Sequence, residues 1–378
     1  MSGRMAVLGR GHEVMSRNSA LLLAVLCAIS APGFVSTATA QARSSDAERW
    51  EVPRTPDGHP DLQGKWSNGT LTPFEREEGK GPVFTSEEVD AIERPTGQTE
   101  GCPPSPGTVE CGRVLTESGS NEARLRGQEY NEVYWDRGSR VATVDGEPRT
   151  SLITFPSNGR IPALTPEGQR RKQEYHEFRS RFGQYDHPEL RPLAERCLVY
   201  YASSPTATLG PPMTPSGGYN NNIRVIQTAD YVVIHGEMVH DTRIIHLGEP
   251  NRLPAHVRPW FGDSWGRWEG NTLVVETTNI HPDMGFNEQG DKILNSEDLK
   301  VIERFTRVAD DSILYEFEIH DSRTYTEVWG GQVPWVKFDQ RIYEYACHEG
   351  NYALANVLSG ARYQERMEAQ GSSDSRRD

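Results

Sequence analysis

The densest group of chemically capable side chains lies in the segment 234–243, Ile-His-Gly-Glu-Met-Val-His-Asp-Thr-Arg. It places a carboxylate, an imidazole and a guanidinium close together, from Glu237, His240 and Arg243. An imidazole that titrates near neutral pH, a carboxylate that orients it and a cation that holds negative charge are the parts of an acid–base site. We therefore predict that His240 transfers protons, that Glu237 orients it and that Arg243 stabilises developing negative charge.

Two other interpretations of this segment remain open. The spacing His235-x-Glu237-x-x-His240 offers ligands to a metal ion, but it is not the helical His-Glu-x-x-His pattern of zinc peptidases. The same side chains also suit an exposed polar hairpin tip without chemistry. We expect the acid–base interpretation, with no metal ion and no cofactor. No glycine-rich phosphate loop follows a strand and opens a helix, which argues against a nucleotide cofactor.

A second segment, 260–270, contains three tryptophans, Trp260, Trp265 and Trp268. Their flat apolar surfaces suit an aromatic or sugar ligand, although each also suits ordinary core packing. Asp263 either caps a turn or places another carboxylate beside His240. Gly262-Asp-Ser264-Trp-Gly266 has the spacing of the Gly-x-Ser-x-Gly motif, but the predicted elements around it are strands and no helix follows it, so it is not a nucleophile elbow and we do not expect a serine hydrolase. We predict that the three tryptophans bind substrate and that Asp263 belongs to the catalytic group.

A third segment, 343–352, lies where the last predicted strand meets a closing helix. Ends of barrel strands often carry ligand-binding groups. We predict that His348 and Glu349 supply a second proton-transfer group and that Asn351 contacts substrate. Asn279, which follows an apolar strand, is another predicted substrate contact, and the nearby His281 is its alternative. Asn279 and His281 also suit an ordinary polar turn that binds no ligand.

The first 40 residues have the three parts of a secretory signal peptide. Three arginines precede an apolar run over 21–29, and a small-x-small cleavage site follows at 38–40. The run is shorter than the ~20 residues of a membrane span. No later segment is apolar enough to span a bilayer. We expect a periplasmic or secreted protein that begins near Gln41.

Four cysteines follow this segment, and an even number in an exported chain suggests disulfides. We expect the pairs Cys102–Cys111 and Cys197–Cys347, with other pairings, free thiols, a Cys347–His348 nucleophile and a zinc site as alternatives. The formal charge of −14 argues against a nucleic-acid partner, because such a protein carries a basic stripe.

The elements that must position these residues are mainly β. From residue 221 onward, short β runs alternate with turn signals, which predicts a large antiparallel barrel or sandwich. The expected strands include 223–227, 231–234, 243–247, 272–277, 299–306, 312–319, 324–329 and 340–345. We divide the chain into a signal peptide (1–40), an irregular N-terminal region (41–220), a β core with a closing helix (221–368) and a disordered tail (369–378).

The N-terminal region contains two predicted helices. One begins at Thr85 or Ser86, with acidic residues in its first turn. The other has Thr165 as its N-cap and Pro166 at its first position. Its aromatic edge, formed by Tyr175, Phe178 and Phe182, is expected to pack against the core.

Three motifs give the chain a resemblance to known proteins. Asp57-Gly-His-Pro-Asp-Leu-Gln-Gly, Gly262-Asp-Ser-Trp-Gly-Arg-Trp-Glu-Gly-Asn-Thr-Leu-Val-Val and Cys347-His-Glu-Gly-Asn-Tyr resemble a largely uncharacterised family of exported bacterial proteins. Gly64-x-Trp66, followed by antiparallel strands and a late helix, is similar to the calycin (lipocalin-like) pattern. That second resemblance implies a barrel with an apolar ligand cavity.

These observations predict an exported enzyme that acts on a small apolar or aromatic molecule by acid–base chemistry, as a lyase, isomerase or hydrolase. The main alternative is a lipocalin-like periplasmic binding protein, and a structural envelope protein is a third. A bell-shaped dependence of rate on pH distinguishes the enzyme from the carrier.

Overall fold

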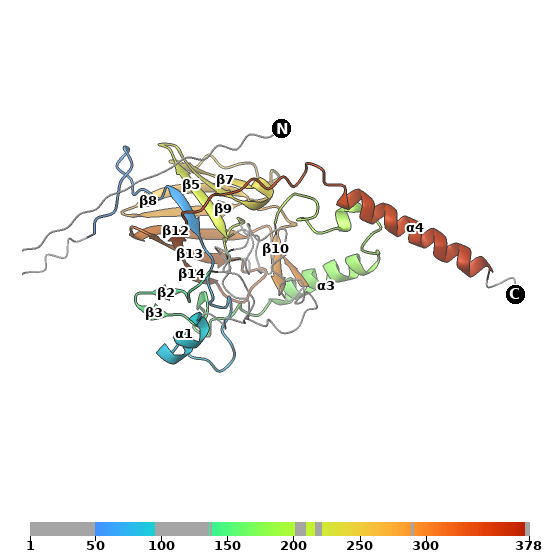
Figure 1. Cartoon of the computed structure of the whole chain (residues 1–378), viewed down its shortest axis with the longest axis horizontal. Helices are drawn as coiled ribbons and strands as arrows, with labels where there is room; N and C mark the ends of the chain where they lie inside the picture. Colours follow the sequence, from blue (N-terminus) through green and yellow to red (C-terminus); the bar gives the residue numbers. More distant parts are fainter. Residues whose placement is uncertain are drawn as a thin grey trace, which may run out of the picture. The chain divides into compact units, whose positions relative to one another are not determined.

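The computed structural model describes residues 50–94, 136, 138–200, 209–215, 221–288 and 291–374 (Figure 1). The predicted signal peptide and the pair Cys102–Cys111 lie outside the described residues, as does the side chain of His240. Among the helices of the described ranges, none combines the length and the apolar character needed to cross a membrane.

Nine strands form a closed β-barrel, which confirms the predicted mainly β fold. Around the ring, the strands follow the order of the chain, and β14 closes it by pairing with β1. The strands of the ring are β1 (Gly64–Ser67), β5 (Asn222–Gln227), β6 (Tyr231–Gly236), β7 (Thr242–Leu247), β8 (Asp263–Glu269), β9 (Thr272–Thr278), β12 (Lys300–Ala309), β13 (Ser312–His320) and β14 (Trp329–Lys337).

Neighbouring strands of the ring are antiparallel except for β7 and β8, which are parallel. Parallel neighbours cannot be joined by a tight hairpin turn, so the chain must return along the barrel between them. The segment 248–262 makes this crossover. It ends at Gly262, whose φ of 73° suits glycine, and a Cβ there would meet the Thr278 carbonyl oxygen at 2.5 Å.

Smaller elements surround the barrel. They are β4 (Ile153–Phe155) on the edge of β14, the hairpins β2 (Thr143–Val144) with β3 (Glu147–Pro148) and β10 (Gly285–Glu288) with β11 (Asp291–Leu294), the helices α1 (Ser86–Glu93), α3 (Pro166–Ser180) and α4 (Ala353–Asp374), and the short helices η2 (Pro188–Leu190) and η3 (Met238–His240). α3 lies beside the β10–β11 hairpin (Figure 1).

Large side chains fill the barrel interior. In β13, every second residue is buried, because side chains alternate between the two faces of a strand. Tyr315 and Phe317 of this strand meet Trp66, Phe305 and Trp335 inside the ring, and each of the five is 2 % exposed or less. Side chains of the described strands therefore occupy the volume in which the calycin resemblance implies a ligand cavity.

Two of the predicted strands are wrong, 324–329 and 340–345. The chain forms a turn before β14, which starts at Trp329, and 340–345 has no regular structure. β14 pairs with β13 on one side and with β4 and β1 on the other, so no edge remains for a later strand. Sequence also missed β14 beyond Trp329, where Gly330 and Gly331 are required. A Cβ at these positions would meet the carbonyl oxygens of Phe317 and Leu152 at 2.0 and 2.2 Å.

The region described from sequence as irregular contributes β1 to the ring and β4 to the edge of β14. Both predicted helices in this region are confirmed, as α1 with Thr85 as its N-cap and α3 with Thr165 as its N-cap. The closing helix is also confirmed, and α4 continues to Asp374, beyond the predicted end at 368.

We name the two ends of the barrel by their residues. At the Asn222 end, β5 and β8 begin and β6 and β9 end, and the opposite end carries the β8–β9 turn. The segment 54–62 covers that opposite end. His59 stacks on Trp268 with 5.0 Å between ring centroids, and Arg54 donates to the Asn271 side chain at 2.8 Å. The first of the three motifs therefore packs against the second.

Candidate functional site

Arg243 lies inside the barrel. Its guanidinium donates to both carboxylate oxygens of Glu303, to Ser264 Oγ at 3.1 Å and to Thr277 Oγ1 at 2.8 Å. Tyr315 donates its hydroxyl proton to the same carboxylate at 2.9 Å. Burial acts to lower the pKa of Arg243, but the Glu303 carboxylate outweighs burial and the pKa is raised. The structure thus pairs Arg243 with a buried carboxylate rather than bringing it to Glu237.

Glu237 is buried at the Asn222 end, where one carboxylate oxygen accepts from Asn222 Nδ2 and the other from the Tyr343 backbone N–H, each at 2.8 Å. Burial raises the pKa of Glu237, the two hydrogen bonds oppose that effect, and the charge of Asp136 adds to it. His240 follows in η3, and its side chain is outside the described residues. Both oxygens of Glu237 are therefore already bound within the chain.

Asp241 is a titratable group that sequence reasoning did not select. Burial raises its pKa from 3.8 to about 7. In the described part of the chain, no donor reaches its carboxylate. The sequence did offer a signal for Asp241, because this residue directly follows His240 in the segment 234–243.

Asp263 and Asn279 hold the crossover 248–262 in place. The Asp263 carboxylate accepts from the Leu253 N–H at 2.9 Å and from the Trp265 indole at 3.0 Å. Asn279 Nδ2 donates to the Leu253 carbonyl at 3.0 Å. Arg252 donates to the Asp263 carbonyl at 2.9 Å. These predicted site residues therefore position the segment that carries Trp260.

The three tryptophans are spread over the molecule. Trp268 stacks on His59 at the opposite end, and Trp265 stacks on His246 with 4.9 Å between centroids. Trp260, near the end of the crossover, is the one that lines a cleft. The structure does not gather the three into one ligand site.

The Cys347 motif is anchored by a disulfide between Cys197 and Cys347, which is the predicted pair. Asn351 Nδ2 lies 3.3 Å from Cys197 Sγ. His348 and Glu349 are exposed just beyond the bridge. The disulfide thus joins the segment after η2 to the segment before α4.

A cleft of about 990 Å³ lies next to the Asn222 end. One wall consists of α3 and the residues that follow it, up to Arg196. The other wall consists of Trp260, His281, Asp283, Gly285 and Lys292. Ligand pockets are typically ~300–1,000 Å³. The cleft is therefore large enough for a small molecule.

The first turn of α3 is fixed on the loop between β13 and β14. Thr165 caps the helix by accepting from the Gly168 N–H at 3.0 Å, and its own N–H donates to the Thr324 carbonyl at 2.9 Å. Gly168 packs directly on that loop, since a Cβ there would meet the Thr324 carbonyl oxygen at 2.6 Å. The helix start predicted from Thr165 and Pro166 is thus also the point at which α3 docks.

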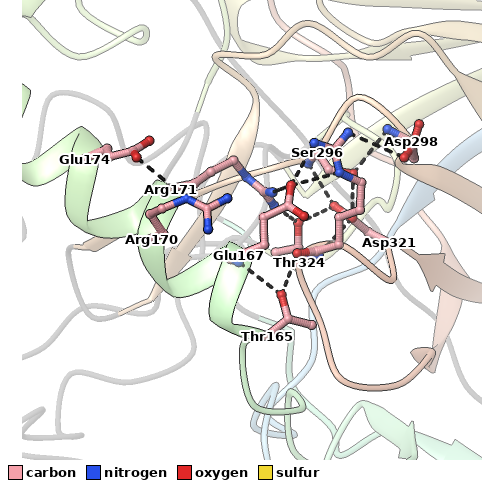
Figure 2. Close-up of polar contacts among 11 residues, drawn as sticks. Thr165, Glu167, Arg170, Arg171, Glu174, Ser296, Asp298, Asp321 and Thr324 are labelled. Atoms are coloured by element: carbon pink, nitrogen blue, oxygen red, sulfur yellow. Dashed lines mark hydrogen bonds and ion pairs between the residues drawn. The ribbon is translucent and has the colours of Figure 1, made fainter.

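Figure 2 shows the polar network around this docking point. Asp321 accepts from the hydroxyls of Ser296 and Thr324, both at 2.6 Å. Arg171 reaches from α3 to Thr324 Oγ1 and to Glu167. These contacts fix the orientation of α3 and, with it, one wall of the cleft.

The aromatic edge of α3 faces the cleft instead of the core. Phe178 and Phe182 are 45 % and 43 % exposed, and their ring centroids are 5.2 Å apart. The predicted packing of this edge on the core is wrong for these two residues, because the helix is held at its N-terminus. Tyr175 is the part of the edge that meets the other wall, with Lys292 Nζ 5.7 Å from its ring centroid.

His281 is held between a ring and a backbone donor. It stacks on Trp260 with 4.0 Å between centroids, and its Nδ1 accepts from the Asp283 N–H at 3.1 Å. Burial lowers the pKa of His281, which favours the neutral imidazole. Because Nδ1 is an acceptor, the proton of the neutral ring lies on Nε2. His281 is therefore a neutral hydrogen-bond donor.

Two further titratable groups of the cleft have shifted pKa values. Burial lowers the pKa of Lys292, the charge of Asp283 opposes this, and Arg179 adds to the lowering. Burial also raises the pKa of Tyr175, which keeps its phenol protonated. The charge of Asp283 acts on Lys292, Tyr175 and His281 alike.

Clustered shifts of this kind mark functional sites more often than ordinary surfaces. Sequence reasoning selected Trp260 and named His281, but it missed Lys292, Tyr175 and Asp283. The one available signal was Asp283, two residues after His281. Lys292 comes from a short hairpin with no distinctive pattern.

Within the described ranges, no three His, Cys, Asp or Glu side chains are placed to share a metal ion. Comparisons with protein-family models, with curated proteins and with solved structures find no match to this chain.

Proposed function

We propose that the chain is an exported enzyme that binds a small aromatic anion in the cleft and transforms it by proton transfer. The observation that carries the proposal is the Trp260–His281 stack beside Lys292 in a cleft of about 990 Å³. It joins a flat apolar surface, a neutral hydrogen-bond donor and an amine in one ligand-sized space.

Aromatic rings and cations from both walls support the class of ligand. Phe178, Phe182 and Trp260 offer ring faces or edges to a planar molecule. Burial lowers the pKa of Lys292, and the nearby positive charge of Arg179 adds to that lowering. A carboxylate or phenolate between two such cations relieves their repulsion and gains charge-assisted hydrogen bonds.

The same side chains support acid–base chemistry. The amine of Lys292, whose lowered pKa favours the neutral form, accepts a proton. The Tyr175 phenol donates one, and His281 Nε2–H hydrogen-bonds an oxygen on which negative charge develops. Elimination, isomerisation or hydrolysis of an aromatic substrate uses a proton acceptor, a proton donor and a hydrogen-bond donor of this kind. We assign these steps to the cleft in preference to Glu237, whose two oxygens are bound by Asn222 and Tyr343.

Export is part of the proposal, and the Cys197–Cys347 disulfide supports it because such bonds persist in oxidising compartments. The likeness of the three motifs to an exported bacterial family points the same way. A lipocalin-like carrier with a ligand inside the barrel is disfavoured, because side chains of the described strands fill that interior.

Two matched fluorescent probes test the ligand class. Anilinonaphthalene sulfonate and phenylnaphthylamine share the same rings, but only the first carries an anion. We expect the folded protein to bind the sulfonate more tightly, and Lys292→Met to weaken that binding by about tenfold, the cost of one charge-assisted hydrogen bond. Trp260→Leu should weaken the binding of both probes, because it removes the shared ring contact.

Arg267→Gln is the matched control, since Arg267 is an exposed cation on β8 outside the cleft lining. It should leave both dissociation constants unchanged. Equal binding of the two probes, or the same weakening by Arg267→Gln and Lys292→Met, would contradict the proposal. Catalysis is then tested by screening aromatic carboxylates and phenols for turnover that His281→Ala and Lys292→Met abolish.

A further inference from the structure

We propose that Lys292 is a nucleophile, whose amine forms a covalent imine with a carbonyl group on the aromatic anion bound in the cleft. The inference rests on the proposed function and narrows its substrate class to aromatic aldehydes or ketones that carry an acidic group. Three features of the structure lead to it: the partners of Lys292, its neighbours in the cleft and the position of the proton donors.

Lys292 differs from other lysines of the chain in its partners. Lys80, Lys300 and Lys337 lie 3.4, 3.7 and 3.8 Å from carboxylates, and Lys65 donates to backbone carbonyls of 339 and 340. Lys292 forms no ion pair with a carboxylate of the described residues. Its ammonium group instead lies over the ring of Tyr175. An amine without such a partner is available for reaction.

Burial and the charge of Arg179 favour the neutral form of Lys292, which is the nucleophilic form of an amine, and the charge of Asp283 opposes them. The side chain is largely removed from water between α3 and β11, and burial penalises the ammonium ion. The guanidinium of Arg179 adds a like charge. A desolvated lysine next to another cation is the usual arrangement for an amine that reacts with carbonyl compounds.

The reaction balances with the groups present in the cleft. The neutral amine of Lys292 adds to the carbonyl carbon, and the C–O π bond breaks as its oxygen takes a proton. The amine nitrogen then loses a proton, the hydroxyl leaves as water after protonation, and a C=N bond replaces C=O. The Tyr175 phenol and His281 Nε2–H lie in the same cleft as donors to that oxygen. No oxidant or reductant is needed.

The cleft also explains why the carbonyl compound is aromatic and acidic. Trp260 and His281 present stacked rings against which a benzene ring packs. Arg179 remains as a cation for the acidic group once Lys292 has become part of the imine. In an aryl alkyl ketone, the imine delocalises negative charge that develops on the alkyl carbon next to the original carbonyl, so it serves proton transfer there. An aryl aldehyde has no hydrogen on the carbon next to its carbonyl, and it reports imine formation alone.

Reductive trapping tests the inference. The protein is incubated near neutral pH with para-formylbenzoate and cyanoborohydride, which converts an imine into a stable secondary amine, and peptides are then analysed by mass spectrometry. We expect one adduct on Lys292 before any other lysine is modified. Lys300, which is on β12 and paired with Glu276, serves as the internal reference.

One variant, one competitor and one uncharged aldehyde complete the experiment. Lys292→Arg should lose the adduct while it still binds anilinonaphthalene sulfonate, which shows that the cleft is intact. Excess anilinonaphthalene sulfonate should slow trapping on Lys292 and leave Lys300 unaffected. Benzaldehyde, which lacks the carboxylate, should react more slowly at Lys292.

Two outcomes overturn the inference in different ways. If para-formylbenzoate displaces the sulfonate probe but Lys292 reacts no faster than Lys300, the cleft binds aromatic anions and the nucleophile is wrong. If it neither displaces the probe nor forms an adduct, the proposed ligand class fails and the imine fails with it.

Discussion

Arg243 and Asp241 are two positions apart in the sequence and have opposite surroundings. Arg243 is 2 % exposed and meets the Glu303 carboxylate inside the barrel. Asp241 is partly buried, and burial alone raises its pKa to about 7. A buried charge costs free energy unless it is paired, so Asp241 opposes folding whenever it is ionised.

The titration of Asp241 predicts a pH-dependent effect of Asp241→Asn. The folded protein holds the carboxyl proton more tightly than the unfolded chain, so this stabilisation is present below pH 3.8 and is lost as pH rises through about 7. We expect Asp241→Asn to raise the free energy of unfolding by about 1–3 kcal/mol above neutral pH, a range reduced for partial solvent access, and to add little near pH ~4.

Urea unfolding of both proteins at several pH values measures this difference. Asp230→Asn is the control, because Asp230 is exposed at the turn before β6. This substitution removes the same charge at an exposed position, so it controls for the change in net charge. A constant difference between Asp241→Asn and the natural chain across the same range is the result that would rule out the predicted titration.

Residue types alone predicted part of the site. The pattern Glu237, His240, Arg243 indicated a convergent group, but β7 directs Arg243 into the barrel, toward a carboxylate 60 positions later in the chain. No local pattern encodes such a partner. Trp260, which the sequence analysis selected as a substrate contact, lines the cleft, whereas Lys292 belongs there only because α3 lies against its hairpin.

At the scale of elements, α3 is anchored by polar contacts at its first turn. Its first turn is held by Thr165, Gly168 and Arg171 against the β13–β14 loop, while Phe178 and Phe182 remain exposed at the other end. The width of the cleft therefore depends on contacts at the helix N-terminus, at the other end of α3 from the two exposed rings.

Gly168→Ala tests this dependence. The added Cβ would meet the Thr324 carbonyl oxygen at 2.6 Å, so the helix must shift. We expect a loss of about 1–3 kcal/mol in unfolding free energy and weaker binding of anilinonaphthalene sulfonate. Gly360→Ala in α4 is the matched control, since no heavy atom lies within 4 Å of a Cβ there. It should leave probe binding unchanged and slightly raise stability.

Equal effects of the two glycine substitutions on probe binding would mean that α3 does not set the cleft. The start of α1 and the N-cap of α3 were predicted from sequence because their signals are local. The strand predicted at 340–345 contains Ile342, Tyr343 and Tyr345, which are residue types common in strands. It failed because pairing depends on a free edge, which is a property of the whole sheet.

At the scale of the whole molecule, one covalent bond spans a large part of the chain. The Cys197–Cys347 bridge closes a loop between residues 150 positions apart. It also fixes the segment 193–197, of which Leu193, Ala194 and Arg196 line the cleft. The disulfide therefore couples the stability of the chain to the shape of the site.

We expect the variant Cys197→Ser/Cys347→Ser to lose up to about 5 kcal/mol of unfolding free energy, the chain-entropy value for a loop of this length. It should also bind anilinonaphthalene sulfonate more weakly than the natural chain. Urea unfolding with and without reductant measures the first effect, and fluorescence titration measures the second.

The double variant is its own control for the remaining cysteines. Any response of the variant to reductant reports on Cys102 and Cys111, which are expected to form a second bridge. If reductant shifts the unfolding midpoint of the natural chain no more than that of the variant, the long-range bridge does not form in solution.

In a closed ring of strands, every neighbouring pair can be antiparallel only when the number of strands is even. This ring has nine strands. One neighbouring pair must therefore share a direction, and here it is β7 and β8. The return path 248–262 is thus obligatory, and it delivers Trp260 to the end of the barrel where the cleft lies. Shortening that path to a hairpin turn would make β7 and β8 antiparallel, and a ring of nine strands would then need a parallel pair elsewhere.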